Sequence, residues 1–277
     1  MLEAFGEPLV QRVLVVALLT SLMTGMLGTY VVTKRMASVT GGLAHAAFGG
    51  VGLGYLLGFD PMLGATGFSV LSGLGVGLAY RRVHSAFDTS ISMVWSGGMA
   101  LGVILVALAP GYAPDLTSYL FGNILFAGWD YALLLGAFDL LVVVLFVLWG
   151  PVLEATSFDE EFCEILGLPV EWILLGMLTL LAAAVVALIR VAGVILAIAL
   201  LTVPAATARH WAVSIRSMML ISVMLAAASS VAGLLASYWF SEAFQLSVPP
   251  GPTMVLLALS GYGLSSVLKW WRDRRSL

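Results

Sequence analysis

The chain has 277 residues, of which 61% are hydrophobic and 10% are charged, and its formal net charge is −3 at pH 7. With a mean hydropathy of +1.07, this composition excludes an ordinary water-soluble globule, which could not bury so much apolar surface. The single cysteine, Cys163, excludes a disulfide within the chain and a cysteine-rich metal site. The sequence therefore predicts an all-α, polytopic transmembrane helix bundle.

The predicted crossing helices follow from the apolar stretches, because a helix needs about 20 apolar residues to cross a bilayer. Charged or Pro/Gly-rich breaks leave nine stretches within a single transmembrane domain, residues 1–277. They cover about residues 10–32, 37–58, 62–80, 90–109, 130–149, 171–189, 191–208, 217–239 and 253–270. Between Trp172 and Ala208 only Arg190 is charged, yet one helix of that length would run about 55 Å. We therefore predict two crossing helices here, joined by a turn at residues 190–193.

The second stretch is rich in small residues that recur every four positions. They are Gly42, Ala46, Gly50, Gly54 and Gly58. Residues with this spacing lie on one face of a helix, and small side chains let a neighbouring helix approach closely. We expect this stripe to be a helix–helix interface.

His45 is the only histidine inside a predicted span, because His84 and His210 lie beside basic residues in loops. Gly41 and Gly49 lie one turn to either side of it, and we expect them to leave open space around the imidazole. An ionisable group at membrane depth usually faces a pathway or the bundle interior, and neutral imidazole binds zinc, manganese or iron(II). His45 is thus either a transient metal ligand or a packing histidine bonded to a nearby carbonyl.

Asp139, inside the fifth stretch, is the second buried ionisable candidate. Its carboxylate could coordinate a cation, pair with Arg12 or Arg190, or be protonated. These alternatives stay open from the sequence.

A short helix is predicted over residues 158–166. The sequence at 157–160, Ser-Phe-Asp-Glu, fits a capping box, and Gly167 before Leu168-Pro169 ends the helix. Its apolar face holds Phe158, Phe162, Ile165 and Leu166, and its acids are Asp159, Glu160, Glu161 and Glu164. So short a helix is marginal alone and should pack on its own bundle, lie in the membrane interface or dock on a partner. We favour a cytosolic partner with a basic surface, because clustered acids gain nothing from an anionic leaflet.

The distribution of Lys and Arg predicts the orientation of the chain. With the N-terminus outside and the C-terminus in the cytoplasm, ten of the twelve basic residues lie on the inner side, and only Arg12 and Arg190 lie on the outer side. Neither lysine follows a glycine, so the phosphate-binding Gly-Lys-Ser/Thr pattern is absent. We expect a non-catalytic membrane subunit, with any ATP hydrolysed by another chain.

Three segments together resemble the permease subunits of the zinc/manganese/iron group of ABC importers, and the similarity covers nearly the whole chain. Residues 190–208, RVAGVILAIALLTVPAATA, look like the family's signature. Residues 158–169 look like its coupling segment, and Leu43-Ala44-His45-Ala46 looks like its second-span motif. Many members carry an aspartate one turn before the histidine and a proline one turn after it, where this chain has Gly41 and Gly49.

The resemblance implies a homodimeric permease in the cell membrane, two cytosolic ABC ATPases and an extracytoplasmic solute-binding protein that delivers the metal. It assigns contact with the ATPase to the coupling segment, at Phe158, Asp159, Glu160, Glu161, Phe162 and Gly167. The divalent metal would be the transported substrate, with no permanently bound cofactor and no nucleic-acid partner. His45, and less directly Asp139, would serve as transient metal sites.

Two other classes of protein fit less well. An ion-coupled secondary transporter working without an ATPase would explain the spans, Asp139 and His45, but not the acidic capped helix, and the two halves show no convincing repeat. An intramembrane metalloenzyme would need a fuller set of ligands than one histidine and one distant aspartate, and the sequence has no His-Glu-x-x-His motif.

Overall fold

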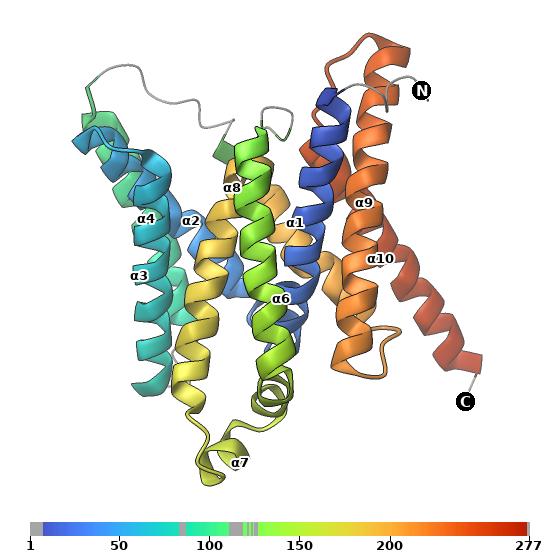
Figure 1. Cartoon of the computed structure of the whole chain (residues 1–277). Coiled ribbons are helices and arrows are strands. Elements are labelled where there is room, and N and C mark those ends of the chain that lie inside the picture. The colour runs from blue at the N-terminus through green and yellow to red at the C-terminus, as the bar shows by residue number, and fades with distance from the viewer. Residues whose placement is uncertain are drawn as a thin grey trace. The chain divides into compact units, whose positions relative to one another are not determined.

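The computed structural model describes residues 8–82, 87–110, 119–120, 122, 124 and 127–275 (Figure 1). Within these residues the regular structure is helical and no strand occurs. The longer helices are α1 (Pro8–Thr33), α2 (Ala37–Leu57), α3 (Pro61–Arg82), α4 (Phe87–Leu108), α6 (Trp129–Phe158), α8 (Val170–Ala208), α9 (Ile215–Phe244) and α10 (Pro250–Arg275), and α7 (Glu160–Ile165) is a short helix between α6 and α8. The prediction of an all-α bundle is confirmed.

Seven of the described helices are long and apolar enough to cross a membrane, namely α1, α3, α4, α6, α8, α9 and α10. The predicted number of nine is not confirmed. The difference has two sources: α2, whose glycines and histidine lower its hydropathy, is not among the seven, and α8 covers two of the predicted stretches. The chain is nevertheless a multi-pass membrane protein.

Helix α8 contains a break where the sequence predicts a turn. Gly193 has φ 74° and ψ 168°, so two helices meet there at a kink. Only glycine adopts this region of backbone space without strain. Gly122, also with a positive φ of 61°, approaches so closely that a Cβ atom on it would collide with the Gly193 nitrogen.

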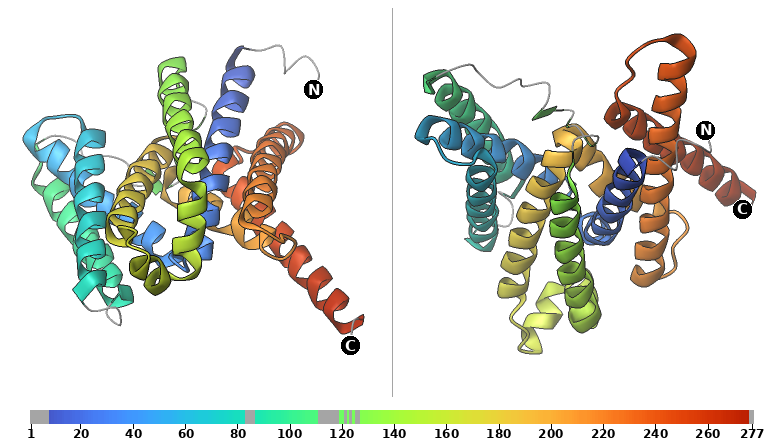
Figure 2. Two further views of the ribbon diagram at one scale, coloured as in Figure 1. Left: turned by 60° about the horizontal axis from the view of Figure 1, so that its bottom comes forward. Right: turned by 45° about the horizontal axis from the view of Figure 1, so that its top comes forward.

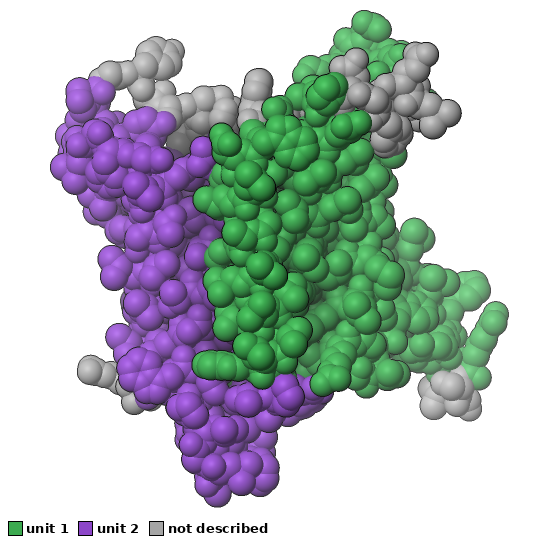
Figure 3. All heavy atoms as spheres, in the orientation of Figure 1, with its two compact units in different colours: residues 1–35, 121–150, 191–277 green, residues 36–120, 151–190 purple. Residues whose placement is uncertain are grey.

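The described chain divides into two compact units, coloured separately in Figure 3. Unit 1 comprises residues 1–35, 121–150 and 191–277, and unit 2 comprises residues 36–120 and 151–190. Each unit is assembled from segments that are distant in the sequence. The expectation of one permease domain over residues 1–277 stays a prediction.

In unit 1, α9 packs against both α1 and α10, and Figure 2 shows α9 beside α1 in both views. Gly25 of α1 lies against Val223 of α9, where a Cβ atom would come within 2.6 Å of the Val223 nitrogen. Gly233 of α9 likewise faces Met254 of α10. A side-chain hydrogen bond also joins α1 to α9, since Ser21 Oγ lies 3.3 Å from Ser230 Oγ.

In unit 2, α2 packs against both α3 and α4. The small-residue stripe is an interface, but it faces two partners: Gly42 meets Ile91 of α4 and Ala46 meets Gly98 of α4, whereas Gly50 meets Gly64 of α3 and Gly54 meets Pro61. Gly58 ends α2 with φ 73° and has open space around it. Gly52, outside the stripe, is packed as closely, since a Cβ atom there would lie 2.8 Å from the Gly102 oxygen. The glycines of α2 therefore form two seams rather than one.

Candidate functional site

His45 lies on α2 in unit 2, with its imidazole stacked on the indole of Trp95 from α4. The ring centroids are 4.6 Å apart and the planes differ by 7°. The histidine is partly buried, and its Nδ1 atom is buried without a hydrogen-bond partner among the described residues. The predicted packing role, with the ring bonded to a nearby carbonyl, therefore has no support at this nitrogen.

The space around His45 differs from the prediction on one side. A Cβ atom at Gly49 would lie 3.0 Å from the Phe68 ring and 3.2 Å from the Gly98 oxygen, so the neighbourhood of Gly49 is filled. Nearby, the Tyr119 hydroxyl donates a hydrogen bond to the Ala44 carbonyl oxygen at 3.0 Å. Burial raises the pKa of Tyr119, so that this hydroxyl is a neutral donor at physiological pH.

Asp139 lies on α6 within unit 1 and is only 3% exposed. Neither carboxylate oxygen has a hydrogen-bond partner among the described residues. An isolated carboxylate in hydrocarbon is costly, and buried acids in spans commonly have functional roles. The structure shows no cluster of three or more His, Cys, Asp or Glu side chains in the described part of the chain. With the ligands that the described residues supply, neither His45 nor Asp139 belongs to a preformed, fully ligated metal centre.

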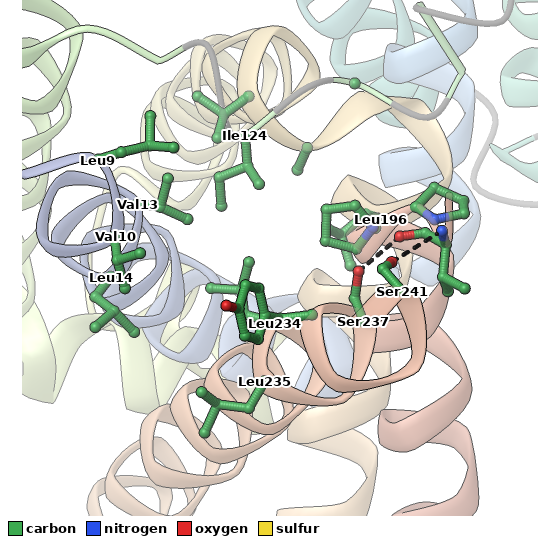
Figure 4. A pocket seen from close by; sticks show the side chains of 18 of the residues that line it. Leu9, Val10, Val13, Leu14, Ile124, Leu196, Leu234, Leu235, Ser237 and Ser241 are labelled. Carbon is green, nitrogen blue, oxygen red and sulfur yellow. Dashed lines mark hydrogen bonds between the residues drawn. The ribbon is translucent and has the colours of Figure 1, made fainter. Parts of the chain in front are cut away.

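A cavity of about 410 Å³ lies in unit 1 where the ends of α1, α9 and α10 meet the second half of α8 (Figure 4). Its walls are mainly aliphatic, and the two labelled serines are engaged with the α9–α10 loop. Ser237 Oγ donates to the Val248 oxygen at 2.6 Å, and the Val248 nitrogen donates to Ser241 Oγ at 3.2 Å. These two hydroxyls therefore hold the α9–α10 loop against the end of α9.

The short helix α7 begins two residues later than the predicted bounds suggest. Asp159 is its N-cap and accepts a hydrogen bond from the Phe162 nitrogen at 2.9 Å. The predicted capping box is wrong, because α6 continues to Phe158 and Ser157 Oγ bonds the Leu153 oxygen within it. The predicted stop is correct: Gly167 has φ 79°, its nitrogen donates to the Glu164 oxygen, and the Leu168 nitrogen donates to the Cys163 oxygen. These two bonds form a Schellman motif.

The apolar face of α7 is not covered by the described chain. Phe158, the last residue of α6, is 76% exposed, Phe162 57% and Ile165 82%, and only Cys163 of α7 is buried. The Tyr80 hydroxyl on α3 donates to Glu160 Oε2 at 3.3 Å and ties the helix to its unit. Figure 1 shows α7 at the tip of the turn that joins α6 to α8. Packing on its own bundle, one of the predicted alternatives, therefore does not cover these side chains within the described residues, and the membrane interface and a partner both stay open.

Comparison with known proteins gives the class of this molecule. The model of the ABC 3 transport family matches residues 7–269. The chain belongs to the ABC 3 transport family. It is 36% identical to a probable metal transport system membrane protein of Chlamydia pneumoniae, over 91% of this chain and 86% of the relative. It is also 31% identical to the manganese import system permease protein ScaB of Streptococcus gordonii, over 89% and 88% of the two chains.

A solved structure agrees with the ABC 3 assignment. The chain matches PsaBC from Streptococcus pneumoniae, determined in complex with Fab, with a TM-score of 0.80 and 28% identity over 96% of this chain and 95% of that one. The membrane location and the transport class predicted from the sequence are confirmed by these relatives.

Sequence reasoning missed two features of this ABC 3 chain. Trp95 was not singled out, since the sequence does not reveal which side of α4 faces α2. His210 was expected only to lie beside basic residues in a loop, but its Nδ1 lies 2.9 Å from Ser265 Oγ of α10, to which Trp211 Nε1 also donates at 2.8 Å. Burial and the nearby Lys269 lower the pKa of His210. His84 lies outside the described residues.

Proposed function

We propose that this chain is the transmembrane permease subunit of an ATP-driven importer for a divalent transition-metal ion: zinc, manganese or iron. The observation that carries the proposal is the family match over residues 7–269, together with full-length relatives named as metal or manganese transport membrane proteins. The chain forms the translocation path and does not itself hydrolyse ATP.

His45 is the residue that we assign to the moving metal. Its buried Nδ1 atom makes no hydrogen bond to a described residue, so no such bond commits the ring to a purely packing role, and neutral imidazole can bind zinc, manganese or iron(II). A single imidazole without a cluster of further acids or histidines holds a metal weakly, which suits release better than retention. The metal is therefore substrate and not a resident cofactor. Asp139, buried and unpartnered in unit 1, is a second and weaker candidate along the path.

The partners follow from the same proposal: a cytosolic ABC ATPase, an extracytoplasmic solute-binding protein and a second copy of this chain. For the ATPase, the exposed face of α7 supplies the contact. Phe158, at the end of α6, and Phe162 are large apolar side chains that the described chain leaves exposed, and aromatic side chains of this kind often anchor interfaces. Their acidic neighbours, Asp159, Glu160 and Glu161, suit a basic groove, and Gly167 fixes the direction in which the chain leaves the helix.

The proposed orientation places the N-terminus outside and the C-terminus in the cytoplasm, in the cell membrane. Single cysteines at Val213, which is 96% exposed, and at Ser247 test it in a Cys163→Ala background. An impermeant thiol reagent added to intact cells should label position 247 and spare position 213. The reverse pattern would invert the orientation.

Metal content is the decisive test of function. Cells that lack the chain should contain less manganese, zinc or iron when grown in metal-depleted medium, and the wild-type gene should restore the missing metal. His45→Ala should restore it poorly while the protein level stays normal. Unchanged contents of all three metals would exclude the import function. Uptake that persists after the partner ATPase is inactivated would instead support an ion-coupled secondary transporter.

A further inference from the structure

We propose that Trp95 is a positioning residue for the metal-binding imidazole, holding the plane of the His45 ring and strengthening its hold on a divalent cation. The inference rests on the proposed function in one respect, namely that His45 meets the transported metal. It goes beyond that function because it assigns a role to a side chain on another helix. The contact that carries it is the stacked pair of rings, 4.6 Å apart and 7° from parallel.

The backbones of α2 and α4 fix where the two rings meet. A Cβ atom at Gly98 would lie 2.6 Å from the Ala46 Cα atom, and one at Gly102 would lie 2.5 Å from the Phe48 oxygen. Gly98 follows Trp95 by almost one turn on α4, and Ala46 is the neighbour of His45 on α2. Helices this close leave little freedom to slide, so the indole is held over the imidazole rather than meeting it by chance.

His45 lacks the polar support that usually orients a ligating histidine. In most metal sites the second ring nitrogen bonds a carboxylate, a carbonyl or water, which sets the direction of the first. Here Nδ1 is buried without a hydrogen-bond partner in the described residues, and the position one turn earlier is Gly41, which has no side chain. Stacking on Trp95 is the described contact that restricts rotation of the ring about its long axis.

Stacking also distinguishes the metal-bound ring from the free one. The face of an indole is electron-rich, and a metal bound at the ring edge withdraws electrons from the imidazole. The pair is therefore more stable when His45 carries a cation. Aromatic pairs of this kind correspond to about a two- to tenfold difference in an equilibrium constant, so we expect the loss of the indole to weaken metal binding by up to that factor.

The test uses the purified full chain in nanodiscs, with Co²⁺ alone as the probe. Equilibrium dialysis gives the dissociation constant, and quenching of tryptophan emission by the paramagnetic ion reports its distance from an indole. Wild type should show saturable quenching. Trp95→Phe should bind Co²⁺ nearly as well but lose the saturable quenching, whereas Trp95→Leu should bind about two- to tenfold more weakly. Trp149→Phe, which removes an exposed indole on α6 in unit 1, is the matched control and should behave as wild type.

His45→Ala separates failure of this inference from failure of the proposed site. If His45→Ala abolishes saturable binding while Trp95→Leu binds like wild type, the positioning role is wrong and the metal site stands. Binding as weak in Trp95→Phe as in Trp95→Leu would also overturn the role, because the phenyl ring preserves a stack. If His45→Ala binds Co²⁺ like wild type, both the proposed site and this inference fail.

Discussion

Helices α2 and α7 carry the two functional hypotheses, and they are stabilised in opposite ways. Most of α2 is buried between α3 and α4, where its glycines bring backbones into direct contact. By contrast, α7 exposes Phe162 and Ile165 and buries only Cys163 among its own residues, and Phe158, the last residue of α6, is exposed beside it. Contacts within the chain account for the packing of α2, whereas no part of the described chain covers the apolar face of α7. Substitutions on α2 and its neighbours should therefore lower protein stability, whereas substitutions on α7 should lower affinity for a partner.

The largest effect is expected at the seam between α2 and α3. A Cβ atom at Gly64 would collide with the Gly50 carbonyl, whereas one at Gly67, on the same helix, would meet nothing within 4 Å. Gly64→Leu should destabilise the protein by about 3 kcal/mol or more, because neither backbone can yield without separating the helices. Gly67→Leu should stay within about 0.5 kcal/mol of wild type. Thermal denaturation in detergent measures both, and equal midpoints would show that the seam is not tightly packed.

The next effect concerns the exposed face of α7. Phe162→Ala should cost about 2 kcal/mol or more in affinity for the partner ATPase, roughly a thirtyfold loss. Its thermal stability should remain close to wild type, because the side chain is 57% exposed in the chain itself. Co-purification of the ATPase provides the measurement. Phe244→Ala, which removes an exposed phenyl at the end of α9, is the control. Retention of the ATPase at wild-type affinity by Phe162→Ala would rule out coupling through α7.

A smaller loss of stability is expected at Gly193, where the backbone conformation requires glycine. Gly193 has φ 74° and ψ 168° inside α8, so Gly193→Ala should lose about 1–3 kcal/mol of stability. Gly176→Ala is the matched control, because Gly176 lies in a regular part of the same helix with nothing within 4 Å of its would-be Cβ. That change should be neutral or stabilise the helix by up to about 1 kcal/mol. Similar denaturation midpoints for the two variants would contradict a glycine-specific kink.

These sites also show how far the sequence could lead. The break in α8 was predictable, because the apolar stretch around Arg190 was too long for one crossing and contained a glycine. The cap of α7 was misplaced because Ser157 and Asp159 are both good capping residues, and only the path of α6 decides between them. Trp95 could not be found, since its contact with His45 depends on how α4 is rotated against α2. Local sequence signals predicted where helices turn and end, but they did not predict how the helices pack against one another.

The smallest effect tests whether the acids of α7 steer the partner or anchor it. Glu164 is exposed and has no apolar bulk to bury, so Glu164→Gln should weaken ATPase binding only a few-fold, and only at low salt. At about 0.01 M salt the screening length is about 30 Å and the lost charge is felt; near 1 M it is about 3 Å and the variant should match wild type. Phe162→Ala should stay impaired at both salt concentrations, because apolar burial is not screened.

The control for this comparison is Glu242→Gln, which removes an exposed acid at the far end of α9. It lowers the net negative charge by the same amount without touching α7, so it separates local steering from a change in overall charge. A loss of affinity in Glu164→Gln that persists at high salt would mean that this carboxylate makes a desolvated contact with the ATPase, and that α7 anchors its partner through charge as well as through its aromatic side chains.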